Sequence, residues 1–327
     1  MKLEEIARLA SVSRTTASYV INGKAEKYRI SEQTRLKVMA VVDKYNYKPN
    51  YAASSLRVGK SRTFGLIIPD LENYSYAKIA KLLERDARKQ GFQLIISCSD
   101  DDIEKEMDVA ENLIQRNIDV LIVVTALSCN TPFYRKIQVN GVPVVAIDRY
   151  LDVKFFSSVI SEDFEGAFQL CDAILKKNIK SIGLIGALPQ LSISRKRELG
   201  FRSALNKHHD TLNVQYAYGK SFSIEQGQCL AQHWIDTNCL PEAIFITSYI
   251  LFEGVLNCFL AHPKLQNKTV LATFGDNRLL DFLPIKVLSL PLQLELIAGK
   301  ALQFALSAAQ GTYNPTVEVV PRQLIKR

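Results

Sequence analysis

The chain has 327 residues, of which 47% are hydrophobic and 23% are charged. This length exceeds what one hydrophobic core usually serves, so two or more domains are expected, and the composition is that of an ordinary globular protein. No apolar run approaches the roughly 20 residues of a membrane helix, and the opening MKLEEIARLA lacks the apolar core of a signal peptide. We therefore expect a cytoplasmic protein with no membrane partner.

The net charge of +8 is concentrated at one end of the chain. Residues 1–62 contain 13 lysines and arginines against 5 acidic residues, so this segment carries the whole excess and the rest is neutral. Such a concentration is the electrostatic footprint of a segment that binds a polyanion. Charge alone also fits a basic domain that binds nothing, so the choice between these two interpretations depends on the sequence motifs.

Three short helices are predicted in the first 48 residues. Apolar residues recur at helical spacing from Leu3 to Ala10, and the pattern breaks at Ser11. Ser13 is a natural N-cap for a second helix that Gly23 stops, and Ser31 is the N-cap of a third. The residues expected to face inward are Leu3, Ile6, Ala7 and Ala10 in the first helix, Ala17, Val20 and Ile21 in the second, and Thr34, Val38, Val41 and Tyr45 in the third.

Three such helices with a tight first turn predict a helix-turn-helix. The second helix would leave Arg14, Thr15, Ser18 and Tyr19 outside, and such side chains can donate to base edges and phosphates in a major groove. The alternative is a three-helix module that binds protein. The absence of large apolar residues from the expected exposed face argues against that alternative.

A second capped stretch follows Pro49. Residues 50–57 are too few to form a stable helix alone, and the polar residues 59–62 follow them. This stretch is typical of a helix that forms conditionally between two domains.

The segments MKLEEIARLASVSRTTASYVINGK, YRISEQT and PNYAASSL resemble the lactose/galactose repressor family of bacterial transcription factors. The segments RTTASYVINGKA and YRIS are most similar to a fructose-responsive branch of that family, and a sucrose-operon branch is a near relative. The resemblance implies a helix-turn-helix DNA-binding domain at residues 1–48 and a hinge helix and linker at 49–62. It also implies that residues 63–327 form a periplasmic-binding-protein-like α/β core for effector binding and dimerisation.

The resemblance further implies which residues contact operator DNA. Arg14, Thr15 and Tyr19 would read bases, while the phosphates would be held by Thr16, Ser18, Asn22 and Ser31, with backbone amides at the N-termini capped by Ser13 and Ser31. The segment beginning at Asn50 would fold on DNA, with Ala53 in the minor groove and Leu56 as a wedge between base pairs. Ser11 stands where many relatives have Gly, and a positive φ there would cost about 1 kcal/mol.

From Thr63 onward, short β-branched runs alternate with helical stretches such as 77–91 and 105–116. Continuous apolar runs are typical of strands buried in parallel sheets. Two successive sets predict two doubly wound parallel-sheet lobes with a ligand cleft between them. The predicted strands are 64–69, 92–99, 119–125 and 142–148 in the first lobe, and 182–187, 242–248, 269–276 and 285–290 in the second.

Polar residues at the strand ends suggest a sugar site. Asp148 and Arg149 end one predicted strand and Asp276 ends another, although a single strand-end aspartate equally fits a helix cap. Arg197 shares a helical face with Phe201 and is expected to point inward, unlike Arg195 and Lys196, which should face water.

By resemblance, Arg197 in SRKRELGF is the family's effector-binding arginine, and Ser75, Phe222 and Ser248 would line the cleft, with Phe222 stacked on the sugar ring. Ser248-Tyr249 replaces the Asn-Asp of many relatives, which argues against a site for a free hexopyranose. Two convergent arginines, Arg149 and Arg197, favour an anion, so fructose 1-phosphate is preferred over free fructose. Free fructose would leave their pairing to Asp148 and Asp276.

An enzyme is the other class to be weighed. The sequence has no GxxxxGK[ST], GxGxxG or GxSxG motif, its four histidines lack metal-ligand spacing, and its six scattered cysteines are interpreted as reduced and mostly buried. No cofactor and no metal are expected. A sugar kinase with a DNA-binding head is the remote alternative. An exported sugar-binding protein is not expected, because the sequence shows no signal peptide.

The prediction is a transcriptional regulator of fructose and carbon metabolism. Twofold operators imply a homodimer, and the sequence has no terminal heptad repeat that would favour a tetramer. The effector would close or rotate the lobes and so disfavour the hinge helix on DNA.

Overall fold

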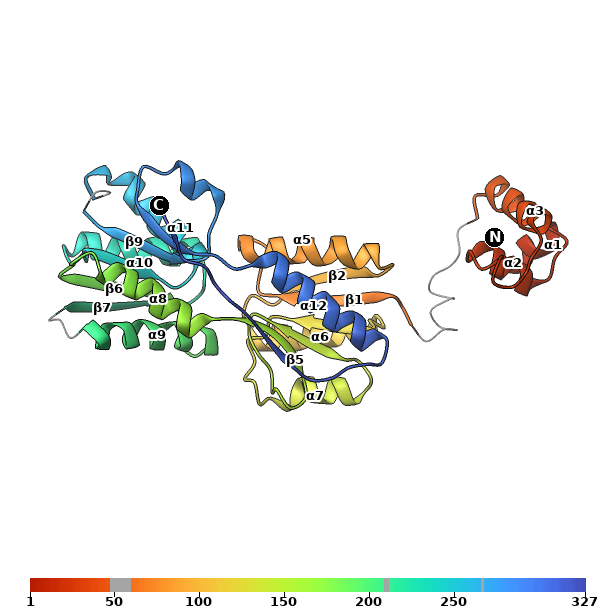
Figure 1. Cartoon of the computed structure of the whole chain (residues 1–327), viewed down its shortest axis with the longest axis horizontal. Helices are drawn as coiled ribbons and strands as arrows, with labels where there is room; N and C mark the ends of the chain where they lie inside the picture. Colours follow the sequence, from red (N-terminus) through yellow and green to blue (C-terminus); the bar gives the residue numbers. More distant parts are fainter. Residues whose placement is uncertain (48–59, 209–211, 266–267) are drawn as a thin grey trace. The chain divides into compact units, whose positions relative to one another are not determined.

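A computed structural model describes residues 1–47, 60–208, 212–265 and 268–327. Two compact units are present, Met1–Ser61 and Arg62–Arg327 (Figure 1).

The first unit is a head of three helices, α1 (Leu3–Leu9), α2 (Arg14–Ile21) and α3 (Glu32–Lys44). Ser13 and Ser31 cap α2 and α3 as predicted, their Oγ atoms accepting from Thr16 N at 3.1 Å and Thr34 N at 3.3 Å. Ser11 lies in the turn between α1 and α2 at φ +54°, so the strained conformation considered for it is present.

The core of the head is small and follows the predicted apolar faces. Its buried residues are Ile6, Ala7, Ala10, Ala17, Val20, Ala25 and Val38. The prediction for the end of the third helix is wrong, because Tyr45 is 44% exposed. Tyr45 lies just after the last residue of α3 as its C-cap, and Tyr47 packs against the core instead.

The second unit begins with a lobe that we call the N-lobe, a six-stranded sheet in the order β11-β5-β4-β3-β1-β2 with every pair parallel. Helices α5 and α12 pack together on one face, and α6 and α7 cover the other. The elements are β1 (Thr63–Ile68), α5 (Tyr74–Lys89), β2 (Gln93–Cys98), α6 (Ile103–Gln115), β3 (Val120–Val123), α7 (Pro132–Val139), β4 (Val144–Ile147), β5 (Ser157–Ser161), α12 (Leu294–Ala309) and β11 (Val317–Val320).

The other lobe, the C-lobe, repeats this architecture in the order β12-β10-β9-β8-β6-β7, with only β12 antiparallel among the pairs described. Alternate side chains of β8 pack against α8 and α9 on one face and α10 and α11 on the other. The elements are α8 (Asp163–Leu175), β6 (Ser181–Ala187), α9 (Ser192–His208), β7 (Asn213–Gly219), α10 (Ile224–Asp236), β8 (Ala243–Ile246), α11 (Tyr249–Ala261), η1 (Pro263–Leu265), β9 (Val270–Phe274), η2 (Arg278–Phe282), β10 (Val287–Leu290) and β12 (Ile325–Lys326).

The two lobes are joined by three connections within the described residues, after β5, after β10 and after β11 (Figure 1). The carboxyl ends of the central strands of both sheets therefore face the space between the lobes, where ligands of doubly wound sheets bind. The prediction of two doubly wound lobes is confirmed.

The sequence analysis did not predict four of the strands, β5, β7, β11 and β12. β5 is rich in serine, and β7, β11 and β12 are short or polar edge strands. The run at 92–99 forms β2, but the expectation of a buried strand there is wrong because β2 lies at the edge of the sheet, where no described neighbour covers its outer side.

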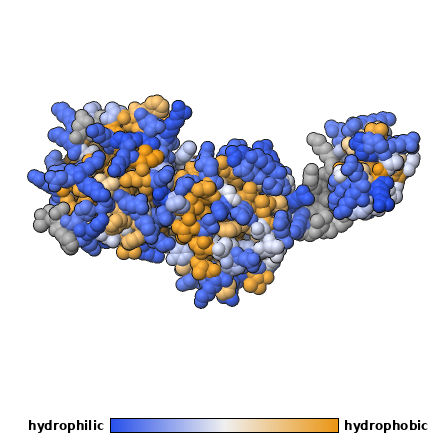
Figure 2. All heavy atoms as spheres, viewed as in Figure 1, coloured by the Kyte–Doolittle hydropathy of each residue, from blue (hydrophilic) through white to orange (hydrophobic). Residues whose placement is uncertain are grey.

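The cysteine prediction is half right. All six are free, yet only Cys171 and Cys258 are buried, while Cys229 and Cys239 are exposed. No helix among the described residues is long and apolar enough to cross a membrane. Most of the face drawn in Figure 2 is hydrophilic, and apolar side chains reach it in separate patches.

Candidate functional site

The head presents the predicted base-reading side chains on α2. Arg14 and Thr15 are exposed, and Tyr19 is half-buried. Arg14 Nε lies 3.1 Å from Glu4 Oε1, an exposed ion pair that contributes little and can give way to a phosphate. The ring of Tyr19 stacks on that of Tyr28, with centroids 3.7 Å apart, which restricts where the Tyr19 hydroxyl can lie.

The N-termini of α2 and α3 are built alike. In each, the capping serine hydroxyl also lies 2.9 Å from a threonine hydroxyl, Thr16 for Ser13 and Thr34 for Ser31. Both serines are exposed, so these helix ends can offer backbone amides and hydroxyls to phosphates.

The expectation for Ser18 is wrong. Its side chain is buried rather than outside, because Ser18 shares the inward face of α2 with Ala17. Asn22 Nδ2 donates to Ser18 O at 2.7 Å and lies 3.3 Å from Ser18 Oγ, so Asn22 caps the end of α2. The remaining predicted DNA contacts, Asn50, Ala53 and Leu56, lie outside the described residues.

A cavity lies between the two lobes of the second unit. The space inside it is about 560 Å³ with the opening to solvent included. Six of the seven predicted effector residues line it, namely Ser75, Asp148, Arg149, Arg197, Phe222 and Ser248. The other lining residues are Asp70, Asn73, Tyr76, Asp101, Ile193, Tyr249, Phe274, Gly275, Leu292 and Arg322.

A strained turn after β4 aims two polar side chains at this cavity. Asp148 has φ +64°, and Arg149 N donates to Ile147 O at 2.7 Å, which together define a γ-turn centred on Asp148. A non-glycine residue in this conformation costs free energy, and such strain is typical of functional sites.

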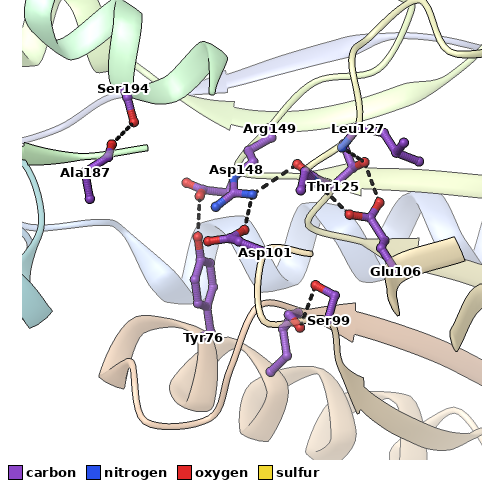
Figure 3. A network of polar contacts seen from close by, with 12 residues as sticks. Tyr76, Ser99, Asp101, Glu106, Thr125, Leu127, Asp148, Arg149, Ala187 and Ser194 are labelled. Atoms are coloured by element: carbon purple, nitrogen blue, oxygen red, sulfur yellow. Dashed lines mark hydrogen bonds and ion pairs between the residues drawn. The ribbon is translucent and has the colours of Figure 1, made fainter. Parts of the chain in front are cut away.

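The Asp148 carboxylate is half satisfied. Oδ2 accepts from the Tyr76 hydroxyl at 2.9 Å, whereas the buried Oδ1 has no hydrogen-bond partner among the described residues (Figure 3). Burial and the neighbouring charge of Asp148 raise the pKa of Tyr76 well above its usual range, so the phenol stays a donor. An unpartnered buried acceptor is suited to a ligand hydroxyl.

Arg149 is buried beside it and held by the N-lobe. Its Nη1 pairs with Asp101 and donates to Thr125 O at 3.2 Å (Figure 3). Its buried Nε has no partner in the described part of the chain, which leaves one donor for a ligand.

The C-lobe side carries two buried arginines that share one carboxylate oxygen. Asp163 Oδ1 accepts from Arg197 Nε at 2.9 Å and from Arg322 Nη2 at 3.1 Å. Both guanidiniums also lie against the Phe274 ring, with the Cζ atoms 4.6 and 4.9 Å from its centroid. Burial, together with the charge of Arg197, lowers the pKa of Arg322 to about 10 although Asp163 opposes the shift. This wall therefore carries excess positive charge.

Three further residues contribute to the cavity wall. The N-terminus of α5 contributes Ser75, where Asn73 Oδ1 caps the helix by accepting from Ser75 N at 3.1 Å. Ser248 caps α11, with Oγ accepting from Leu251 N at 3.4 Å, so its hydroxyl proton stays available to a ligand. The half-buried ring of Phe222 adds an apolar surface.

The structure places Asp276 elsewhere. Its carboxylate pairs with Arg327 Nη1 at 2.7 Å and accepts from Ser289 Oγ at 2.7 Å, and the residue does not line the cavity. The interpretation of Asp276 as an effector residue is therefore not supported. Gly275, one position earlier, lines the cavity and turns the chain at φ +92°.

Some missed lining residues had a signal in the sequence and some did not. Asp70 and Asp101 follow strands β1 and β2, so the strand-end rule applied to Asp148 could have found them. Arg322 lies on a connection between the lobes, where no local pattern marks it. In the described part of the chain no cluster of His, Cys, Asp and Glu could hold a metal ion.

Comparison with known proteins agrees with both halves of this geometry. Residues 2–50 match the model of bacterial regulatory proteins of the lacI family, and residues 61–249 match that of periplasmic binding proteins and the sugar binding domain of the LacI family. The chain is 54% identical over 324 residues to the fructose operon regulatory protein of Vibrio cholerae, covering 99% of each.

Two further relatives are similar over most of their length. The chain is 45% identical over 316 residues to the catabolite repressor/activator of Escherichia coli K12, covering 96% of this chain and 94% of that protein. A crystal structure of the Cra transcriptional dual regulator from Pseudomonas putida in complex with fructose 1-phosphate has a TM-score of 0.77 and 44% identity, covering 81% of this chain and 98% of that one.

Proposed function

The chain belongs to the lacI family of bacterial regulatory proteins, and from this membership we propose a regulator of fructose and carbon metabolism that fructose 1-phosphate releases from operator DNA. The relatives named for the fructose operon and for catabolite control support the sugar, and the complex of the Pseudomonas putida protein supports the phosphate.

The observation that carries the anionic effector is the shared Asp163. One carboxylate partly neutralises two buried guanidiniums, Arg197 and Arg322, which repel one another. A phosphate beside them relieves this repulsion and accepts charge-assisted hydrogen bonds. A neutral sugar cannot do so, which favours fructose 1-phosphate over free fructose.

The opposite wall suits the sugar hydroxyls. Asp148 Oδ1 accepts one and Arg149 Nε donates to another, since both atoms lack partners among the described residues. Ser75 and Ser248 add hydroxyls from two helix N-termini, and Phe222 covers the apolar face of the ring. The ligand thus contacts both lobes at once, which stabilises the closed arrangement.

The head supplies DNA binding in this proposal. Arg14, Thr15 and Tyr19 read bases, and the capped ends at Ser13 and Ser31 hold phosphates. By family resemblance Asn50, Ala53 and Leu56 form the hinge contacts, and a homodimer or a tetramer places two heads on a twofold operator. Operator binding requires the protein to act in the cytoplasm, where bacterial DNA lies.

The effector acts by changing the population of the DNA-competent state. It can shift this equilibrium only by its differential affinity for the two states, typically about 1–3 kcal/mol. Regulation needs no catalytic chemistry, and we expect no phosphate transfer from ATP to fructose.

Calorimetric titration with fructose 1-phosphate, fructose 1,6-bisphosphate, fructose and sucrose tests the proposal. We expect selective binding of fructose 1-phosphate, lost in Arg197→Ala because the anion loses its partner. Arg195→Ala is the matched control, since Arg195 is exposed on the same helix and does not line the cavity. Equal affinity for fructose and fructose 1-phosphate would contradict the anion role. A response to free fructose alone would indicate the sucrose-operon type.

A second arm tests the DNA half. A fluorescently labelled fructose-operon promoter fragment should bind the protein and dissociate on addition of fructose 1-phosphate. Thr15→Ala should weaken this binding and leave the sugar titration unchanged. Undiminished binding by that variant would remove Thr15 from the interface.

A further inference from the structure

Glu106 on α6 is a fully buried carboxylate with no ion pair among the described residues. Three donors surround it: the hydroxyl of Thr125 at 2.5 Å and that of Tyr134 reach Oε1, and the amide of Ala126 reaches Oε2 at 2.6 Å. It does not line the cavity, and the proposed effector contacts do not use it.

A carboxylate in this position is costly to bury. Burial raises the pKa of Glu106, and the hydrogen bonds from Thr125, Tyr134 and Ala126 oppose that shift. All three partners donate, so the arrangement fits the ionised form. Because an apolar residue of similar size would avoid the desolvation cost, the carboxylate has to be explained by what its partners hold in place.

Two of these partners belong to one short turn after β3, residues 125–127. The turn is closed by Leu127 N, which donates to Thr125 Oγ1 at 3.0 Å, and Glu106 accepts from its first two residues. Figure 3 shows Glu106 and Arg149 on different sides of Thr125. The turn therefore lies between a buried anion and a cation of the cavity wall.

The turn has two contacts that matter for a ligand. Thr125 O accepts from Arg149 Nη1 at 3.2 Å, so the turn helps to fix the guanidinium whose Nε is unpartnered in the described structure. Ala126 packs with Leu191 and Ile193 of the C-lobe in a small apolar cluster across the two lobes. One carboxylate thus braces both a ligand-facing arginine and a contact between the lobes.

We propose that Glu106 is a positioning residue for effector binding: by holding the 125–127 turn, it sets the place of the Arg149 guanidinium and of the Ala126 contact. This inference rests on the proposed function, since the effector is the ligand that Arg149 faces. Tyr134 of α7 also donates to Glu106 and lies beside the Thr125 hydroxyl. No hydrogen bond in the described part of the chain joins it to Ala126 or Arg149, so we assign it no such role.

A double-mutant cycle tests the proposal in the full-length protein. Glu106→Gln keeps the shape but replaces an acceptor by an NH2 group, and we expect about tenfold weaker binding of fructose 1-phosphate, the factor of roughly one lost buried hydrogen bond. Tyr134→Phe removes a different bond to Glu106 and should change the affinity by less than about twofold. Combined with Arg149→Lys, Glu106→Gln should cost clearly less than it does alone, because the arginine it positions is gone.

A second readout needs no ligand. Hydrogen exchange should accelerate in Glu106→Gln at peptides covering 125–127 and 148–150 while α7 keeps its protection, and Tyr134→Phe should show the reverse pattern. If Glu106→Gln costs the same affinity with and without Arg149→Lys, or leaves exchange at the turn unchanged, the positioning role is overturned. Failure of the wild-type protein to bind fructose 1-phosphate would instead contradict the proposed function. The exchange experiment would still test whether Glu106 holds the 125–127 turn.

Discussion

Among the non-glycine residues with positive φ, Asp148 and Ser11 show that backbone strain can have different meanings at different places. Asp148 is held in a γ-turn and lines the cavity. Ser11 has φ +54° in an exposed turn of the head. Strain at a site can be retained for function, whereas strain in an exposed turn is open to relief.

Ser11→Gly should therefore stabilise the head by about 0.5–1 kcal/mol, because Gly adopts positive φ without a Cβ clash. Amide hydrogen exchange of α1 and α2 in the full-length protein measures this. Ser13→Ala, two positions away, should lower the stability by about 1 kcal/mol through loss of the N-cap. Faster exchange in Ser11→Gly would show that the serine hydroxyl stabilises the turn.

Mutation of the two aspartates predicted for the site, Asp148 and Asp276, should have different effects on effector binding. Asp148→Asn should weaken fructose 1-phosphate binding by at least about tenfold, because a buried acceptor aimed at the cavity is lost. Asp276→Asn should leave that affinity within about twofold and lower the stability by about 1 kcal/mol through its bond to Arg327. Calorimetric titration of both variants measures the affinity, and thermal unfolding measures the stability. A tenfold affinity loss in Asp276→Asn would show that Asp276 does contact the effector.

At the scale of elements, the distance between helices α8 and α9 depends on a glycine. A Cβ at Gly200 would lie 2.2 Å from the backbone oxygen of Phe164 and 2.8 Å from the Ala167 Cβ. Arg197 precedes Gly200 by one turn on α9, and Asp163 lies at the start of α8. The close packing of these helices thus brings the two charged partners together.

Gly200→Ala should destabilise the second unit by at least about 2 kcal/mol, since the backbone of α8 cannot yield cheaply. Gly299→Ala in α12 is the matched control: nothing described lies within 4 Å of its Cβ, so the higher helix propensity of Ala should add about 0.5–1 kcal/mol. Urea unfolding measures both. Equal effects of the two substitutions would mean that α8 and α9 can separate without cost.

For the whole second unit, the two lobes also meet at contacts outside the cavity. Lys196 Nζ of the C-lobe lies 4.4 Å from the centroid of the Tyr150 ring of the N-lobe, and neither residue lines the cavity. The cluster of Ala126 with Leu191 and Ile193 lies on the same inter-lobe border. These contacts favour the arrangement of the lobes seen in this structure before any ligand contact is counted.

Lys196→Met should weaken fructose 1-phosphate binding about two- to fivefold, the factor of one partly exposed cation–π contact, without removing any ligand contact. Tyr150→Leu should give a similar factor, and the double variant should add little to either. Arg202→Met removes a cation–π contact of equal length to Tyr216 within the C-lobe and serves as control. If the affinity falls equally in Arg202→Met, the contact between the lobes is not the cause of the loss.

The sequence alone determined what depends on neighbours along the chain. Helical spacing and capping serines predicted the three helices of the head, and apolar runs predicted the central strands of both lobes. Strand-end position also placed Asp148 and Arg149 at the cavity. These features follow from local periodicity and from the topology of parallel sheets, so no distant contact had to be known.

The tertiary structure decided what depends on partners far along the chain. Asp276 is drawn away from the cavity by Arg327, whereas Arg322 enters it from a connection between the lobes and shares Asp163 with Arg197. Ser18 turns inward because of the packing of the head. A charged side chain is placed by whichever counter-charge the folded chain brings within reach, and the local sequence does not record that distance.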